Sequence, residues 1–159
     1  IYSINETYIK TIDEKDLFNF FKEYVSKYKK PIDQAKESVL LKSMGFLKNK
    51  AKTLEDIWNN AQYIIIEKIE VGADDKKLID DLSKKVINDF INVFEKLSSP
   101  SRETLEPVIK SLIDKHKTNF KGVGQPLRIA LVGSRFGPGL YDVILSLDKA
   151  EVIKRLKQI

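Results

Sequence analysis

In the segment "ALVGSRFGPGLYDVI", residues 130–144, three glycines and a proline separate two apolar runs. Glycine commonly follows the last turn of a helix and proline commonly opens the next one, so the stretch predicts a turn between two packed elements. We expect Gly133 to follow a helix end and Pro138 to open a helix that continues through Leu147. The apolar run before Gly133 suits either a short helix over 126–132 or a strand, and its pattern leaves both open.

Glycine-rich turns of this kind also form phosphate-binding loops, and two such motifs can be compared with it. A P-loop ends in Lys followed by Ser or Thr, whereas Gly139 is followed by Leu140 and Tyr141. A dinucleotide-binding fingerprint has the order GxGxxG after a strand, whereas the order here is GxxxGxG. Neither motif is present, which favours a turn that joins two helices.

The rest of the chain has the spacing of apolar residues that is typical of helices. Capping-box pairs are expected at Thr11 with Glu14, at Thr53 with Asp56 and at Asp148 with Glu151. The patterns predict helices that start at Thr11 and end before Pro31, and others over about 33–46, 53–65, 74–97, 105–116 (capped by Thr104, with Pro107 in its first turn) and 148–159. The sequence therefore predicts an all-α fold. Gly72 interrupts the pattern, and we expect two subdomains, 1–69 and 70–159.

Composition narrows the class of protein. Hydrophobic residues make up 42% of the chain, enough for a sizeable core, and the 32% of charged residues are mixed in sign. The net charge of +5 favours an anionic partner. The absence of cysteine excludes disulfides and thiolate chemistry and is consistent with the cytoplasm. The sequence contains no membrane-span pattern. Because it begins at Ile1, we expect a piece of a longer protein.

The residues that could carry catalysis are sparse. His116 is the single histidine, and its place late in a predicted helix favours a surface position or an interaction with the helix dipole. No combination of histidine and carboxylates has the spacing of a metal site, and the acidic residues lie among lysines as on a solvated face. The pattern therefore favours binding over catalysis, with no cofactor in this chain.

A lysine-rich segment is a candidate binding surface. Four lysines fall within eleven residues with no acidic residue among them: Lys42, Lys48, Lys50 and Lys52. Such a cluster can hold phosphates, and it can equally be a solubilising surface. The pattern alone leaves both interpretations open.

Several segments of the chain together resemble the C-terminal region of bacterial glutamyl-tRNA synthetase. The specific match is "QPLRIALVG" followed by "PGLYDVI" and a final basic helix containing "EVIKRL". Upstream, "NETYIK" and "KNKAKTLEDIWNNAQYII" are similar to further segments of the family and fall in the same order. The resemblance covers nearly the whole chain.

That resemblance implies a fold and a function. It implies the all-helical, two-subdomain cage of the class I synthetase anticodon-binding type, with the anticodon loop of tRNA-Glu and the catalytic domain of the same chain as partners. The HIGH-like and KMSKS-like motifs of the catalytic domain are absent from this sequence. A glutamate–tRNA ligase would be the parent protein, using ATP and Mg²⁺, and this fragment alone would be inactive.

The resemblance also suggests which residues bind RNA. Arg128 matches an arginine that contacts the anticodon, and Pro138 and Leu140 match positions in the loop that reads the second and third anticodon bases. Gly137 replaces a threonine of some members, which leaves only its backbone for contact.

Lys50 aligns with an arginine that helps to select the first anticodon base, and a lysine there keeps the charge without the planar fork. Lys48 and Lys52 beside it are expected to bind phosphate. Tyr141 is a candidate for stacking on a base, whereas the spacing of Trp58 and Tyr63 favours packing in the core.

Two other classes of function remain open from the residues alone. A helical protein–protein interaction module would ignore RNA and expose an apolar patch. A small enzyme would need a cluster of titratable groups that the sequence does not show.

Overall fold

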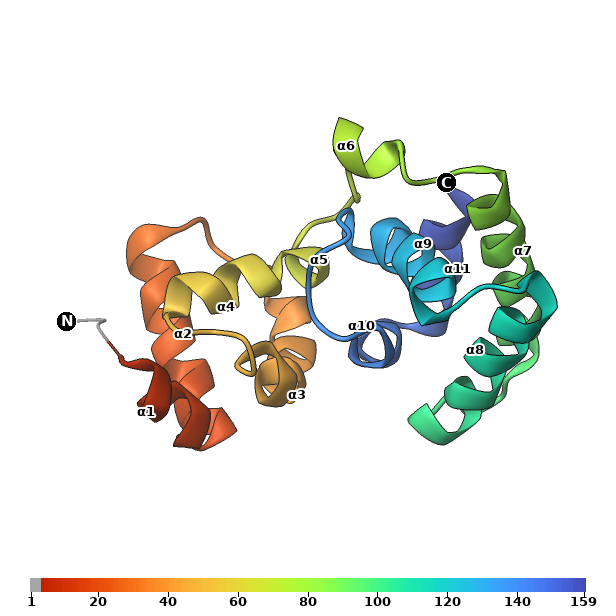
Figure 1. Cartoon of the computed structure of the whole chain (residues 1–159). Helices are drawn as coiled ribbons and strands as arrows, with labels where there is room; N and C mark the ends of the chain where they lie inside the picture. The colour runs from red at the N-terminus through yellow and green to blue at the C-terminus, as the bar shows by residue number, and fades with distance from the viewer. Residues whose placement is uncertain (1–3) are drawn as a thin grey trace. The chain divides into compact units, whose positions relative to one another are not determined.

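The computed structural model describes residues 4–159, and within that range every regular element is a helix (Figure 1). The all-α prediction is therefore confirmed, and the apolar run before Gly133 is helical. The chain divides into two compact units, the first ending at Glu67 and the second spanning Lys68–Ile159.

The first unit is built around the packing of three helices. Its elements are α1 (Glu6–Thr11), α2 (Glu14–Tyr28), the short 3-10 helix η1 (Gln34–Lys36), α3 (Glu37–Leu47), α4 (Leu54–Asn60) and α5 (Gln62–Ile65). Helix α2 packs against α3 and α4. Large side chains of these helices are fully buried between them: Leu17, Phe21, Leu40, Met44, Leu47, Leu54 and Ile57. Removing this apolar surface from water is the main stabilisation of the unit.

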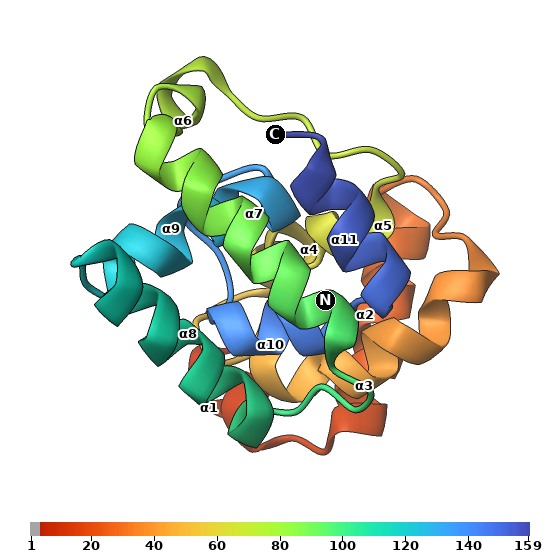
Figure 2. The ribbon, with the colours of Figure 1, turned by 90° about the vertical axis from the view of Figure 1, so that its right-hand side faces the viewer.

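The second unit surrounds one apolar helix. Its elements are α6 (Ala73–Lys76), α7 (Asp81–Lys96), α8 (Arg102–His116), α9 (Phe120–Val132), α10 (Leu140–Ser146) and α11 (Lys149–Lys157). Helix α9 contacts α7, α8, α10 and α11, and Figure 2 shows these helices from a second direction. Because α9 is covered on several sides, Leu127, Ile129, Ala130 and Leu131 are all buried. The glycine-rich segment 130–144 therefore begins in the central helix of this unit.

A buried arginine completes the end of α9. Arg155 of α11 is 5% exposed, and its Nη1 donates to the carbonyl oxygen of Leu131 over 2.7 Å. Its Nε lies 2.7 Å from Glu151 Oε2, which balances the buried charge. A cation at a helix C-terminus satisfies carbonyl groups that have no partner within the helix.

Two of the three predicted capping boxes are wrong. Thr11 is the last residue of α1, and α2 is capped instead by Asp13, whose carboxylate accepts from Lys15 N. Asp148 does precede α11 but makes no capping bond through its side chain, and the carboxylate of Glu151, its expected partner, accepts from Arg155 Nε instead.

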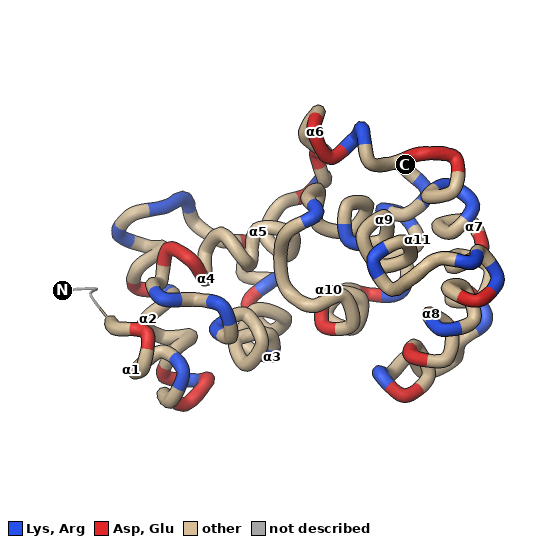
Figure 3. The backbone as a smooth tube through the Cα atoms, in the orientation of Figure 1, with Lys and Arg blue, Asp and Glu red and all other residues tan. Residues whose placement is uncertain are grey.

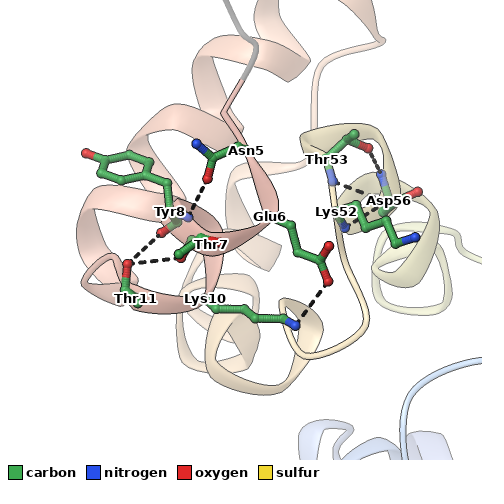
Figure 4. Close-up of polar contacts among 9 residues, drawn as sticks. All are labelled: Asn5, Glu6, Thr7, Tyr8, Lys10, Thr11, Lys52, Thr53 and Asp56. Carbon is green, nitrogen blue, oxygen red and sulfur yellow. Dashed lines mark hydrogen bonds and ion pairs between the residues drawn. The ribbon is translucent and has the colours of Figure 1, made fainter.

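The third capping box is confirmed. Thr53 Oγ1 accepts from Asp56 N over 3.1 Å, and Asp56 Oδ2 accepts from Thr53 N over 3.1 Å, as Figure 4 shows. The second bond of the Asp56 carboxylate is to the neighbouring Lys52 N, so it supports the same helix start.

Two of the predicted helices in the second unit start at other residues than expected. The helix predicted over 74–97 is interrupted, because Asp80 caps α7 by accepting from the backbone N–H of Ser83. Helix α8 begins at Arg102, three residues before the predicted start, with Ser101 as its cap. Thr104 is the inner partner of that capping box, so Pro107 lies in the second turn and not the first.

The helix expected over 126–132 extends six residues further back. Helix α9 begins at Phe120, where Asn119 Oδ1 accepts from Gly122 N over 2.8 Å. Pro126 therefore lies inside the helix and does not open it. Gly133 follows the helix end as predicted, whereas α10 starts two residues after Pro138.

Candidate functional site

The loop that joins α9 to α10, residues 133–139, is shaped at its first residue by a glycine. Gly133 has φ of 86°, in the left-handed region, and its N–H donates to Ile129 O over 2.8 Å. A Cβ at this position would lie 2.7 Å from the carbonyl oxygen of Glu70. Both the backbone conformation and this close approach require glycine, so the chain direction after α9 is fixed here.

Arg128 of α9 holds the far side of the same loop. Its Nε donates to Pro138 O over 3.3 Å, and its Nη1 donates to Arg135 O over 3.5 Å. Burial lowers the pKa of the Arg128 guanidinium from its ordinary value. The guanidinium thus ties together two backbone carbonyls on either side of the loop tip.

Part of the Arg128 guanidinium remains available to a ligand. Nη2 makes no hydrogen bond within the described residues, and no buried side-chain nitrogen or oxygen among them lacks a partner. Nη2 is therefore at least partly accessible to solvent, and its two N–H groups have no partner among the described residues. A guanidinium carries five donors in a fixed plane, so one side chain can both shape the loop and present donors outward.

Arg135, for which the sequence suggested no specific role, is clamped by an acidic residue from far along the chain. Asp75 Oδ1 accepts from Arg135 N over 3.2 Å and from Arg135 Nε over 2.7 Å. The two residues are 60 positions apart. Sequence reasoning missed this contact, since Asp75 had been interpreted as part of a solvated face and no local pattern links it to the loop.

The remaining loop residues differ in how much they expose. Pro138 and Leu140 are buried, and Leu140 begins α10 with only 2% of its surface accessible. Gly137 is half-buried with φ of 148°, and Gly139 is exposed. Pro138 and Leu140 therefore set the loop geometry from beneath and present almost no surface to a ligand.

The loop tip carries an aromatic ring that the sequence reasoning did not single out. Phe136 is 74% exposed. The signal that could have found it is the presence of an aromatic residue inside a glycine-rich turn, where an apolar side chain has no helical face to join.

The three predicted lysines of the first unit fall into two kinds. Lys48 has a 14% exposed side chain, and its Nζ donates to Ile12 O over 3.3 Å and lies 3.9 Å from Glu14 Oε1. Lys50 and Lys52 are exposed and form no ion pair with any described residue. Lys48 thus ties the segment to the unit, whereas the other two ammonium groups are open to an anion.

The backbone around these lysines is held by the capping box at the start of α4. Asp56 Oδ2 also accepts from Lys52 N over 2.9 Å, so both residues before α4 are fixed (Figure 4). Acidic and basic residues are interspersed along the described part of both units (Figure 3). The positive charge available to an anion in this segment is that of Lys50 and Lys52.

The other aromatic candidates are engaged in packing. The centroid of the Tyr141 ring lies 4.7 Å from Arg102 Cζ, beneath the guanidinium. It lies 6.2 Å from the centroid of the Phe120 ring. Its burial raises the pKa of the Tyr141 hydroxyl. Tyr63 is 2% exposed, and Trp58 packs 6.5 Å from the ring of Phe21. Tyr63 and Trp58 lie in the first unit's packing, in line with their helical spacing.

His116 is also part of a structural contact. Its Nε2 lies 2.7 Å from Asp89 Oδ2, and Lys115 Nζ approaches the same oxygen at 2.9 Å. The hydrogen bond from Lys115 is the largest effect that lowers the pKa of the Asp89 carboxyl, and the hydrogen bond with His116 lowers this pKa further. The cluster joins α7 to α8.

Two kinds of feature are absent from residues 4–159. No group of three or more metal-ligating side chains gathers at one point. None of the helices is long and apolar enough to cross a bilayer.

Comparison with known proteins places the chain in a family. The family described as "Anticodon binding domain" matches residues 12–159. A glutamate–tRNA ligase of Pelagibacter ubique is 53% identical over 156 residues, covering 98% of this chain and 34% of that protein. One of Nitrobacter hamburgensis is 29% identical, covering 97% of this chain and 34% of that protein. The chain thus spans about a third of the length of these relatives.

Solved structures show the same fold. The crystal structure of a glutamate tRNA ligase from Elizabethkingia meningosepticum has a TM-score of 0.78 and 21% identity, and it covers 97% of this chain and 30% of that one. A glutamate–tRNA synthetase structure from Elizabethkingia anophelis has a TM-score of 0.70. With the family match over residues 12–159, this chain belongs to the anticodon-binding domain family, in the form found in glutamate–tRNA ligases.

Proposed function

We propose that this chain binds the anticodon loop of tRNA-Glu, as the anticodon-recognising part of a glutamate–tRNA ligase. The observation that carries the proposal is the geometry of Arg128, which shapes the loop at 133–139 and keeps Nη2 at least partly accessible to solvent. Single-stranded RNA loops expose the hydrogen-bonding edges of their bases, and a guanidinium with free donors can bond to such an edge.

The residues of the candidate site take different roles in this proposal. Arg128 contacts a base, and Gly137 offers only its backbone to the RNA. Pro138 and Leu140 are buried and hold the loop that contacts the anticodon in shape. The absence of a side chain at Gly137 and Gly139 lets the bases approach closely.

The two exposed lysines of the segment before α4, Lys50 and Lys52, bind phosphate in this proposal. Lys50 and Lys52 are exposed and without ion pairs to described residues, so their charge is available to the RNA backbone. Phosphate contacts position an RNA and strengthen its binding without reading sequence. Lys48 acts indirectly, by fixing the segment to the carbonyl of Ile12.

The wider role follows from the relatives. The parent protein would attach glutamate to tRNA-Glu in the cytoplasm, using ATP and Mg²⁺ in a catalytic domain that this chain does not contain. The residues 1–69 and 70–159 would act as two anticodon-binding subdomains. The chain alone would not aminoacylate tRNA and needs no cofactor to bind it.

The test is a titration with three RNA hairpins that share one stem and differ only in the anticodon. They carry the glutamate anticodon, the glutamine anticodon and an unrelated anticodon, and a stem closed by a stable tetraloop is the control. We expect the glutamate hairpin to bind about tenfold or more tightly than the unrelated one. Equal affinity for these two hairpins would contradict the proposal. The glutamine hairpin measures whether tRNA-Gln is also accepted.

A further inference from the structure

Phe136 is the most exposed large apolar side chain in the described part of the protein, with 74% of its surface accessible. Single exposed apolar residues are common on protein surfaces, so exposure alone assigns no role. What distinguishes Phe136 is how the surrounding loop presents its ring.

The backbone on both sides of Phe136 is fixed. Arg128 donates to the carbonyl oxygens of Arg135 and Pro138, and Asp75 accepts from the N–H of Arg135. The N–H of Phe136 itself donates to Ser134 Oγ over 3.1 Å. The ring therefore projects from a backbone that is already ordered, and a ligand that covers it loses little additional chain entropy on binding.

The surroundings of the ring favour a flat ligand. The Arg135 guanidinium lies 5.5 Å from the centroid of the Phe136 ring and is held there by its ion pair with Asp75 Oδ1 at 2.7 Å. Gly137 and Gly139 place no side chain beside the ring. An exposed aromatic ring on an ordered loop can stack a base.

We propose that Phe136 is a stacking platform for one unpaired base of the bound RNA loop. This inference rests on the proposed function, because it assigns a contact within the same RNA complex. Stacking on Phe136 would act in addition to the hydrogen bonds that Arg128 is proposed to make with a base edge. Since every base has a π-face, Phe136 strengthens binding of an open loop without selecting its sequence, whereas Arg128 contributes to selection.

The experiment uses hairpins with the glutamate anticodon in which 2-aminopurine replaces one anticodon base at a time. We expect the wild-type chain to quench one labelled position, because stacking on a ring quenches this base. Phe136→Ala should lose that quenching and bind the unlabelled hairpin about tenfold more weakly. Phe136→Trp should restore affinity, and Phe136→Leu, which is apolar but has no π-face, should not.

Two controls separate stacking from a change in fold. Val93, 40% exposed on α7, provides a matched apolar truncation as Val93→Ala, which should bind like the wild type. Because Phe136 is exposed, all of its variants should retain the wild-type melting temperature and helical circular dichroism. A variant that binds weakly with an unchanged melting curve therefore reports a lost contact.

The outcomes for the two proposals are distinguishable. If the wild type discriminates anticodons and Phe136→Ala binds with the same affinity and quenching, the stacking role is overturned and anticodon binding stands. Restoration of binding by Phe136→Leu would show an apolar contact and would likewise overturn stacking. If the wild type binds all hairpins alike, anticodon recognition and the inference built on it both fail.

Discussion

Arg128 donates a hydrogen bond from Nε to the carbonyl oxygen of Pro138 over 3.3 Å, ten residues further along the chain. This bond joins the central helix of the second unit to the end of the loop that precedes α10. Any group that binds the open Nη2 therefore meets a guanidinium whose orientation is already set. The site is preorganised by the same side chain that is proposed to contact the RNA.

The first prediction separates these two roles of Arg128. Arg128→Ala removes both loop bonds and the open donors, and it should weaken binding of the glutamate hairpin by about 1–3 kcal/mol. It should also reduce discrimination between the glutamate and unrelated hairpins. Arg128→Lys keeps the charge without the planar fork, so it should retain phosphate attraction and still lose discrimination. Fluorescence anisotropy titrations measure both quantities, and unchanged discrimination in Arg128→Lys would rule out base contact by the fork.

The second prediction concerns the exposed lysines. Lys50→Ala and Lys52→Ala should weaken binding of every hairpin by a similar factor, because phosphate contacts carry no sequence information. Each should reduce the slope of log affinity against log salt by about 0.7, the value for one lost contact to single-stranded RNA. Lys110→Ala, an exposed lysine of α8, is the control and should change neither. A loss of affinity for one anticodon alone would assign Lys50 to base selection instead.

Lys48 should behave differently from its neighbours. Its ammonium is mostly covered and bonds to the carbonyl of Ile12, so Lys48→Met should lower the free energy of unfolding by about 1 kcal/mol. The salt slope of RNA binding should remain that of the wild type. Urea denaturation and salt titrations of the same variant distinguish the two effects, and a reduced salt slope with unchanged stability would contradict this assignment.

A third prediction concerns the stability effect of replacing Gly133, the first residue of the loop 133–139, with Gly72 as the matched comparison. Gly133→Ala places a Cβ 2.7 Å from Glu70 O at φ of 86°, so it should destabilise the chain by at least about 1–2 kcal/mol. Gly72→Ala should be tolerated, because Gly72 has φ of −66° and its nearest neighbour would lie 4.0 Å away. Thermal unfolding of both variants provides the comparison, and equal melting temperatures would show that the loop adjusts at Gly133.

A fourth prediction follows from the lowered pKa of Asp89. Its carboxylate is held by Lys115 and His116, so its folded pKa lies below the value of about 3.9 in an unfolded chain. The resulting stabilisation is present above about pH 4 and is lost as the pH falls through the folded pKa. Asp89→Asn should therefore melt lower than the wild type at pH 7, and the gap should narrow at acid pH.

The control for that prediction is Asp114→Asn, an exposed residue of α8 with no ion pair to a described residue. It should follow the wild-type pH dependence of melting. A gap between Asp89→Asn and the wild type that stays constant from pH 7 to below pH 3 would show that the carboxylate is not stabilised by its charge.

Local sequence patterns predicted some features because those features depend on neighbouring residues. The Thr53–Asp56 capping box arises within one helical turn, and Gly133 follows a helix end as expected. The Thr11 and Asp148 caps failed because other nearby residues compete for the same groups. Asp13 caps α2 in place of Thr11, and the carboxylate of Glu151, the expected partner of Asp148, accepts from Arg155 four residues further on.

The sequence by itself determined that the chain is helical, where a glycine-rich turn falls, that the net charge is positive, and which family the motifs resemble. Which charged side chains have a bonded partner, and which remain available to a ligand, depends on the tertiary structure. Lys48 is tied to Ile12 while Lys50 is open, and Arg135 is clamped by Asp75. The physical reason is that helix periodicity and capping act over a few residues, whereas an ion pair between residues 60 positions apart forms only after the helices have packed.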